Sequence, residues 1–307
     1  MTDVKGEYRR LLGQFLHDVS FRMPDYGQSP SIEDAVVDYF ESQGFDAEFI
    51  TRAGPAIKAS CIIATTTYPF VSIEIQRVIG IYTTFAICID DITNVSTADL
   101  KGFLDRLCRS EPQPNLLLRD MLRFIAEEIP KFYGPFAGDM IRKSIIEFTC
   151  ACVVENEYHG EVVPARTAPD FPYYFRHKTG MAEAYAFFAF PETLAPEKTA
   201  MPVYLPVIPD LVRYFNPAND LLSFYKESVV GEERFNYIYN HAQYNGIGPL
   251  ESLRSTATDV TRCIHNAKTT FSGTPTLSDA VTQVFHGYIV YHWSSSRYRL
   301  SELDPQA

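Results

Sequence analysis

Three oxygen-bearing side chains recur at intervals of four residues in the stretch NDLLSFYKE, which runs from Asn219 to Glu227. Four residues of an α-helix rotate about 40° beyond a full turn, so Asn219, Ser223 and Glu227 would form one ladder along a single face. An amide oxygen, a hydroxyl and a carboxylate are hard ligands suited to Mg²⁺, and Lys226 could reach a phosphate held there. The apolar neighbours favour a metal site over a solvated polar face, because polar groups in such surroundings need partners.

A second acidic signal, the pair Asp90-Asp91, closes a long apolar stretch that begins near Phe70. Two carboxylates at the end of a buried helix repel each other and oppose the local helix dipole. A bound divalent cation would resolve both problems. An ordinary solvated helix end explains the pair equally well when it is taken alone.

Two further groups could bind an anion beside such a metal. Arg297-Tyr298 combines a fork-shaped set of N–H donors with a hydroxyl, and the spacing from Trp293 to Arg297 predicts that the two share one helix face. Arg176 precedes Thr179-Gly180, where a glycine inside a helical pattern predicts a break or a close backbone approach. A break would turn a carbonyl toward a cavity. Each group is common in isolation, so a plain surface role stays open for both.

Helical periodicity dominates the elements that would position these groups. The stretch 70–91 is apolar over more than twenty residues without a turn signal after Gly80, which favours a buried helix over a strand. Short loops containing Pro and Gly separate the segments, and strands do not alternate with helices. The sequence therefore predicts an all-α bundle in a single domain over residues 1–307. The other predicted helices span 31–44, 100–108, 116–132, 136–157, 172–189, 217–232, 248–270 and 277–300.

Composition excludes several kinds of partner. The net charge of −11 argues against nucleic acid and anionic membranes, because phosphate backbones and anionic headgroups need a basic face. No run approaches the roughly 18 apolar residues of a membrane span, and the N-terminal stretch does not resemble a secretory signal. The six cysteines form no paired CxxC, which argues against zinc. They predict buried thiols in a reducing compartment, and therefore a cytoplasmic protein.

Taken in order, the Asp-Asp pair, Arg-x-x-Thr-Gly, NDLLSFYKE and the C-terminal Arg-Tyr resemble the class I terpene synthases, most closely the fungal trichodiene synthase family. The resemblance covers about residues 82–303 and includes Tyr133-Gly134-Pro135-Phe136, Phe285-His286-Gly287-Tyr288 and the segment from Arg297 to Glu302. It implies the α-helical class I terpenoid synthase fold with a central active-site cavity. It also implies a sesquiterpene cyclase that ionises farnesyl diphosphate with three Mg²⁺ ions, which Mn²⁺ could replace.

The resemblance further implies a role for each motif. Asp90 would bind metal from one side, with Asp91 in support, and Asn219, Ser223 and Glu227 would hold metal from the other. Thr179 would link the arginine before it to Gly180, whose carbonyl helps to trigger ionisation. The diphosphate would accept hydrogen bonds from Arg176, Lys226, Arg297 and Tyr298.

The carbocation left by ionisation needs a dry pocket, and aromatic faces could stabilise it through their quadrupoles. Ordinary core packing explains each aromatic candidate equally well. The candidates are Tyr82, Phe85, Phe148, Phe187, Tyr291 and Trp293.

The chain departs from the trichodiene-forming members at three points, so the product is open. Asn94 stands at the usual third acidic position, and the tail after Arg-Tyr is shorter. Pro217 predicts a kink or a fresh helix start at Asn216-Pro217.

Several alternatives stay open or rank lower. A cyclase acting on geranyl diphosphate and an inactive terpenoid-binding homologue remain alternatives, as do a homodimer and a monomer. A chain-elongating prenyl diphosphate synthase would need a second Asp-rich motif, and a class II cyclase an Asp-x-Asp-Asp motif.

Overall fold

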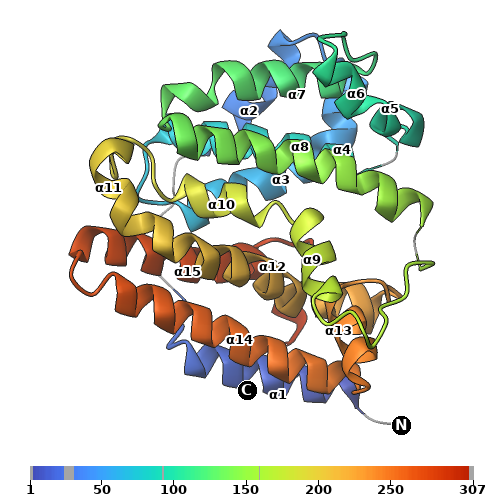
Figure 1. Cartoon of the computed structure of the whole chain (residues 1–307), viewed down its shortest axis with the longest axis vertical. Helices are drawn as coiled ribbons and strands as arrows, with labels where there is room; N and C mark the ends of the chain where they lie inside the picture. The colour runs from blue at the N-terminus through green and yellow to red at the C-terminus, as the bar shows by residue number, and fades with distance from the viewer. Residues whose placement is uncertain (1–2, 24–30, 92, 159, 304–307) are drawn as a thin grey trace.

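The computed structural model describes residues 3–23, 31–91, 93–158 and 160–303. Every regular element in these residues is a helix, and none is a strand (Figure 1). The prediction of an all-α fold is confirmed. The α-helices are α1 (Val4–Asp18), α2 (Glu33–Ser42), α3 (Ala47–Thr67), α4 (Ile73–Asp90), α5 (Thr97–Lys101), α6 (Phe103–Cys108), α7 (Leu116–Glu127), α8 (Pro135–Glu157), α9 (Phe171–Lys178), α10 (Ala182–Phe188), α11 (Glu197–Tyr204), α12 (Ile208–Phe224), α13 (Tyr237–Asn245), α14 (Pro249–Thr270) and α15 (Pro275–Ser294).

The long helices run roughly side by side, and α12 lies near the middle of the bundle (Figure 1). It packs against α14 on one side and α10 on the other, while α3 packs against α4 and α15. The short helices α9 and α13 contact each other and lie together at one end of the bundle. This arrangement brings the C-terminal ends of α4 and α12 to the same end as α9 and α13.

Helix α4 confirms the prediction of a buried helix over 70–91. Twelve of its 18 residues are buried, including Tyr82 and Phe85, so the helix has no solvated face to produce an amphipathic pattern. Its N-terminus is capped by Ser72, and its last residue is Asp90. The paired carboxylates therefore stand where the buried helix reaches solvent.

Three helix boundaries decide the geometry of the motifs. The predicted break at Gly180 is confirmed, because α9 ends at Lys178 and α10 begins at Ala182, with Met181 in the left-handed region at φ 50°. At Asn216-Pro217 the sequence predicted a kink or a fresh helix start. The fresh start is wrong, since α12 runs from Ile208 through Pro217 to Phe224 as one helix, and the kink stays a prediction. A π-helical segment, η3 (Tyr225–Val230), then continues the chain.

The third boundary corrects the expectation for the C-terminal motif. Helix α15 ends at Ser294 and not near residue 300, so Arg297 does not share a helix face with Trp293. Arg297 and Tyr298 lie in a turn, where the Tyr298 N–H donates to the Ser295 carbonyl over 3.1 Å. This turn ends at Arg299, whose φ is 60°.

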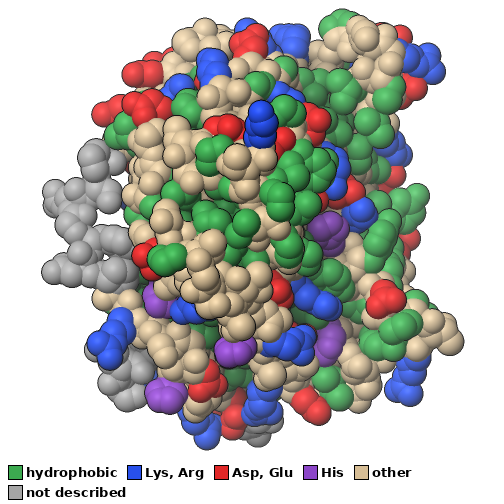
Figure 2. Space-filling view, turned by 60° about the vertical axis from the view of Figure 1, so that its left-hand side comes forward, with side chains coloured by type: hydrophobic (Ala, Val, Ile, Leu, Met, Phe, Trp, Pro, Cys, Tyr) green, Lys and Arg blue, Asp and Glu red, His purple; other side chains and the backbone are tan. Residues whose placement is uncertain are grey.

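The surface carries charged side chains of both signs. Acidic and basic side chains alternate over the face drawn in Figure 2, with apolar side chains between them. The six cysteines are unpaired, and four of them are buried. Among the described residues, no helix has the length and apolar character needed to cross a bilayer.

Candidate active site

A polar cavity of about 280 Å³ lies at the end of the bundle where α4, α9 and α12 meet. Most of the motif residues predicted from the sequence line it. Its charged and polar lining includes Asp90, Glu155, Arg176, Thr179, Asn219, Asp220, Lys226, Glu227, Glu233, Asn236, Asn240, Arg297 and Tyr298.

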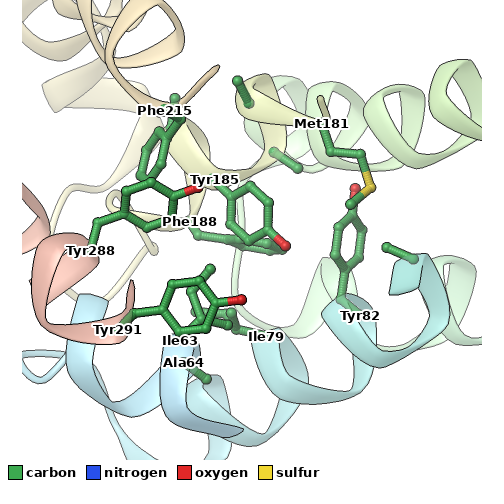
Figure 3. Packing of buried hydrophobic residues seen from close by; sticks show 14 of the residues in the cluster. Ile63, Ala64, Ile79, Tyr82, Met181, Tyr185, Phe188, Phe215, Tyr288 and Tyr291 are labelled. Atoms are coloured by element: carbon green, nitrogen blue, oxygen red, sulfur yellow. The ribbon is translucent and has the colours of Figure 1, made fainter. Parts of the chain in front are cut away.

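A second, aromatic chamber of about 150 Å³ adjoins this polar cavity. Its wall includes Tyr185, Phe215, Tyr288 and Tyr291, whose rings cluster together across from Met181 (Figure 3). The two cavities lie next to each other and share part of their walls, because they have lining residues in common. The shared residues are Arg176, Thr179, Asn219, Arg297 and Tyr298.

The predicted oxygen ladder lies on two kinds of helix. Asn219 and Ser223 belong to α12, whereas Glu227 lies in the π-helical segment η3, so the third rung does not follow α-helical spacing. Such segments occur frequently at functional sites. Asn219 and Glu227 line the polar cavity. Ser223 lines neither cavity, its hydroxyl is fully buried, and its oxygen has no hydrogen-bond partner among the described residues.

The unpartnered hydroxyl of Ser223 tests whether the site fits a metal ion. Leaving a buried polar group unpaired costs about 1–3 kcal/mol, so proteins rarely keep one without a reason. A hard cation between Asn219 and Glu227 would give this oxygen a partner. The residues present therefore fit Mg²⁺, which favours amide, hydroxyl and carboxylate oxygens.

The two aspartates of the Asp90-Asp91 pair differ in their position relative to the polar cavity. Asp90 lines the polar cavity, and desolvation raises the pKa of its carboxyl although Arg297 acts in the opposite direction. Asp91 lies outside the cavity lining, and its Oδ1 accepts the N–H of Thr93 over 3.0 Å. The side chain of Asn94 is used structurally, because it donates to the Cys88 carbonyl and accepts from Arg52.

Three further carboxylates of the cavity were missed in the sequence. Burial raises the pKa of Asp220 to about 6 and the pKa of Glu155 to about 8, and nearby Asp90 adds to the second shift. Burial and then Glu227 raise the pKa of Glu233 to about 7. Glu155 comes from α8, and its carboxylate, that of Asp90 and the Cys152 thiol lie within 4.8 Å of one another.

Asp220 stands next to Asn219 in the motif and could have been found from that position. Glu155 carries no spacing signal relative to the other motifs, because it comes from α8. Glu233 lies just beyond the end of η3, where helical spacing no longer applies. Carboxylates with perturbed pKa values cluster at functional sites, so their gathering here marks this cavity as the candidate site.

Arg176 is held at the boundary between the two cavities. Its Nε donates to Oδ2 of Asp220 over 2.7 Å, and one terminal nitrogen donates to Oδ1 of Asn219 over 3.1 Å. Gly180 lines the aromatic chamber at the helix break. A Cβ placed there would lie 1.9 Å from Oδ1 of Asn216, so a side chain at this position would have to displace the buried amide of Asn216.

The remaining donors surround the same polar cavity. Lys226 lines it, with its Nζ 3.8 Å from a carboxylate oxygen of Glu227. Arg297 and Tyr298 line both cavities, and the Tyr298 hydroxyl lies 3.0 Å from the hydroxyl of Tyr291. The structure thus brings together all of the predicted cationic donors.

Among the six aromatic candidates, Tyr291 lines the aromatic chamber and Phe148 lines the polar cavity. The other four line neither cavity. The hydroxyl of Tyr82 donates to the Ile141 carbonyl, and Phe85 packs against other buried rings. The remaining two are Phe187, which packs against Phe136, and Trp293, which packs against the core.

Helical spacing could have identified two of the missed aromatics. Tyr288 lies three residues before Tyr291 on α15, and Phe215 lies four residues before Asn219 on α12. Each shares a helix face with a residue that the sequence did indicate. Tyr185 belongs to α10, beyond the break at Gly180, and no spacing signal pointed to it.

Comparison with known proteins bears on the whole chain. The family model for trichodiene synthase (TRI5) matches residues 36–307. The chain is 45% identical over 302 residues to an (E)-beta farnesene synthase of Metarhizium brunneum, covering 98% of this chain and 91% of that protein. It is 31% identical over 297 residues to the terpene synthase BipA of Cochliobolus sativus, covering 94% and 87% of the two chains.

A solved structure supports the fold. The linalool/nerolidol synthase of Streptomyces clavuligerus matches with a TM-score of 0.60 at 13% identity, covering 89% of this chain and 99% of that chain. The polar cavity and the aromatic chamber thus lie in a fold shared with terpene synthases. The chain belongs to the trichodiene synthase (TRI5) family and is a terpene synthase.

Proposed function

We propose that this enzyme is a Mg²⁺-dependent sesquiterpene synthase that ionises farnesyl diphosphate and cyclises the resulting carbocation, with release of diphosphate. One observation carries the proposal: a polar cavity rich in carboxylates and cations adjoins an aromatic chamber and shares five lining residues with it. A prenyl diphosphate matches this pair of cavities, because its charged diphosphate is joined to an apolar hydrocarbon chain. The wall between the compartments, where Arg176 and Tyr298 lie, would then face the bond that breaks.

The metal ions would supply Lewis-acid stabilisation of the charge that develops on the leaving diphosphate. Asp90 would hold metal from the α4 side, with Asp91 in support. Asn219, Ser223 and Glu227 would hold it from the α12 side. Three ions are expected for this family, and Mn²⁺ would satisfy the same oxygen ligands.

The protein's own donors would orient the diphosphate and stabilise its charge. Arg297 and Lys226 present cations to the polar cavity, and Tyr298 offers a hydroxyl at the boundary between compartments. Arg176 donates to Asp220 and Asn219 in this structure, so it would exchange one or both of these partners for a phosphate oxygen. Gly180, at the helix break, would turn its carbonyl toward the breaking bond.

The aromatic chamber would exclude water and stabilise the carbocation. The rings of Tyr185, Phe215, Tyr288 and Tyr291 line this chamber from three helices, α10, α12 and α15 (Figure 3). Their faces carry partial negative charge, which attracts a cation in a desolvated space. A second outcome is elimination to an acyclic farnesene, and the name of the relative from Metarhizium brunneum favours it.

Incubation of the purified chain with geranyl, farnesyl and geranylgeranyl diphosphates, each with Mg²⁺ or with EDTA, tests the proposal. The volatile products would be identified by gas chromatography and mass spectrometry. We expect a sesquiterpene from farnesyl diphosphate that EDTA abolishes, and its mass spectrum separates a cyclic product from an acyclic one. Turnover of geranyl diphosphate alone would make the enzyme a monoterpene synthase. No turnover by the folded protein would favour an inactive terpenoid-binding homologue.

A further inference from the structure

A buried histidine lies directly behind one of the predicted metal ligands. His292, near the end of α15, has no exposed surface and lines neither cavity. Its Nδ1 lies 2.8 Å from the carbonyl oxygen of Tyr288, and its Nε2 lies 3.2 Å from Nδ2 of Asn219. The Tyr298 ring packs on it at a centroid distance of 4.2 Å. Both ring nitrogens are therefore engaged, one of them by the side chain of Asn219.

These two contacts determine where the imidazole carries its proton. A backbone carbonyl can only accept, so Nδ1 of His292 must donate to Tyr288. A neutral imidazole with its proton on Nδ1 leaves Nε2 as an acceptor, which takes a hydrogen from Nδ2 of Asn219. Burial away from water favours this neutral form.

The same contacts determine the orientation of the Asn219 amide. With Nδ2 directed at His292, Oδ1 faces the terminal nitrogen of Arg176, which donates to it over 3.1 Å. The flipped amide would oppose its oxygen to the lone pair of Nε2 and its N–H groups to the guanidinium. Both contacts would then be repulsive, so only one orientation satisfies the neighbours.

We propose that His292 is a positioning residue for the metal site, which holds the carboxamide of Asn219 with its oxygen toward the polar cavity. The inference rests on the proposed function, because it assumes that Asn219 binds metal there with Ser223 and Glu227. A side chain that orients a ligand lowers the entropy lost when the metal binds and prevents the amide N–H₂ from facing the cation. His292 lines neither cavity, so its hydrogen bond to Asn219 is the route by which it would act on the metal site.

A purely structural role for His292 would give a different result. If the imidazole only fills the core, its loss would lower the unfolding free energy without a specific effect on metal binding. The measurement must therefore report metal binding separately from stability. Mg²⁺-dependent binding of inorganic pyrophosphate, followed by isothermal titration calorimetry on the full chain, does this without turnover.

Three substitutions at His292 separate the two roles. His292→Gln places an amide oxygen near the position of Nε2 and preserves an acceptor for Asn219. His292→Asn retains a donor near Nδ1 but lacks the reach to accept from Asn219, and His292→Leu removes both functions. His286→Leu is the matched control, because His286 lies on the same helix, packs against Phe21 and lines neither cavity.

Loss of a residue that orients a metal ligand typically weakens metal binding about 10–100-fold. We expect the Kd for Mg²⁺-dependent pyrophosphate binding to rise by about this factor in H292N and H292L. The Kd of H292Q and H286L should stay within about threefold of the unmodified chain. If H292L does not fold, the contrast between H292N and H292Q still decides the question.

A double-mutant cycle with Asn219→Ala tests the route of the effect. If His292 acts through Asn219, H292N should weaken binding no further in the N219A background. Independent, multiplicative losses would overturn the inference, and so would H292N binding as tightly as the unmodified chain. Absence of any Mg²⁺-dependent pyrophosphate binding by the unmodified chain would overturn both the inference and the metal site on which it rests.

Discussion

The proton held by Glu155 should make the stability of the protein depend on pH. Burial and Asp90 raise the pKa of this carboxyl from 4.5 to about 8. Between these two pKa values the unfolded chain has released the proton, whereas the folded chain still binds it. The folded state therefore binds more protons, and the unfolding free energy contributed by this group falls as pH rises through that window.

The magnitude follows from the size of the shift. Each pH unit between the two pKa values lowers the contribution of Glu155 to the unfolding free energy by at most about 1.4 kcal/mol. The upper limit of this loss between about pH 5 and pH 8 is therefore about 4 kcal/mol. The Glu155 side chain is partly exposed to the cavity, so solvent screening lowers the contribution. We expect about 2 kcal/mol over this range.

Replacing Glu155 by glutamine removes the titration and keeps the shape of the side chain. Urea unfolding of E155Q and the unmodified chain, followed by circular dichroism in EDTA at several pH values, gives the two unfolding free energies. The unfolding free energy of E155Q minus that of the unmodified chain should increase by about 2 kcal/mol from about pH 5 to pH 8. Glu161→Gln removes an exposed carboxylate outside the cavity and controls for the change in net charge. A difference that is flat or shrinks with pH would refute the reasoning.

Two further predictions concern the boundary between the cavities. Arg176→Met leaves Asp220 buried without its ion-pair partner and should lower the unfolding free energy by about 3–5 kcal/mol near pH 8, measured by urea unfolding. The loss should be smaller near pH 5, since the pKa of Asp220 is about 6, and R176M/D220N should recover part of it. Gly180→Ala forces a Cβ against Asn216 and should cost about 1–3 kcal/mol by the same measurement. Gly13→Ala, which adds a methyl group in open space on α1, is the control and should not lower the unfolding free energy. Equal stability of G180A and the unmodified chain would contradict the close approach at Gly180.

The sequence predicted those parts of the site that depend on local spacing. Asn219 and Ser223 are four residues apart on one helix, and the apolar residues before Asp90 indicated the buried helix that ends there. The glycine at 180 marked a real break between α9 and α10. In each case the relevant physics acts within one or two helical turns, so a single segment carries the information.

Other features depend on contacts between segments and could not be predicted in this way. Glu155 faces Asp90 only because α8 packs beside α4, and no spacing relates the two positions. Pro217 lies inside α12 because packing against α10 and α14 offsets the lost hydrogen bond, which overrides the local preference for a helix start. The end of α15 at Ser294 likewise moved Arg297 into a turn that the periodicity did not reveal.

The balance of charges in the polar cavity should couple the binding of metal to the binding of diphosphate. Among the described lining residues, carboxylates outnumber the cationic side chains of Lys and Arg by five to three, so the ionised cavity would repel a free diphosphate. One feature reduces this repulsion before any ligand binds: with its pKa raised to about 8, Glu155 is mostly protonated near neutral pH, whereas Arg176 is engaged by Asp220. Divalent cations would reverse the local balance, ionise the protonated carboxyl and free Arg176 for the phosphate. We therefore expect diphosphate to bind only together with metal, and the orientation of Asn219 by His292 to matter for both. The carboxylates are Asp90, Glu155, Asp220, Glu227 and Glu233, and the cationic side chains are Arg176, Lys226 and Arg297.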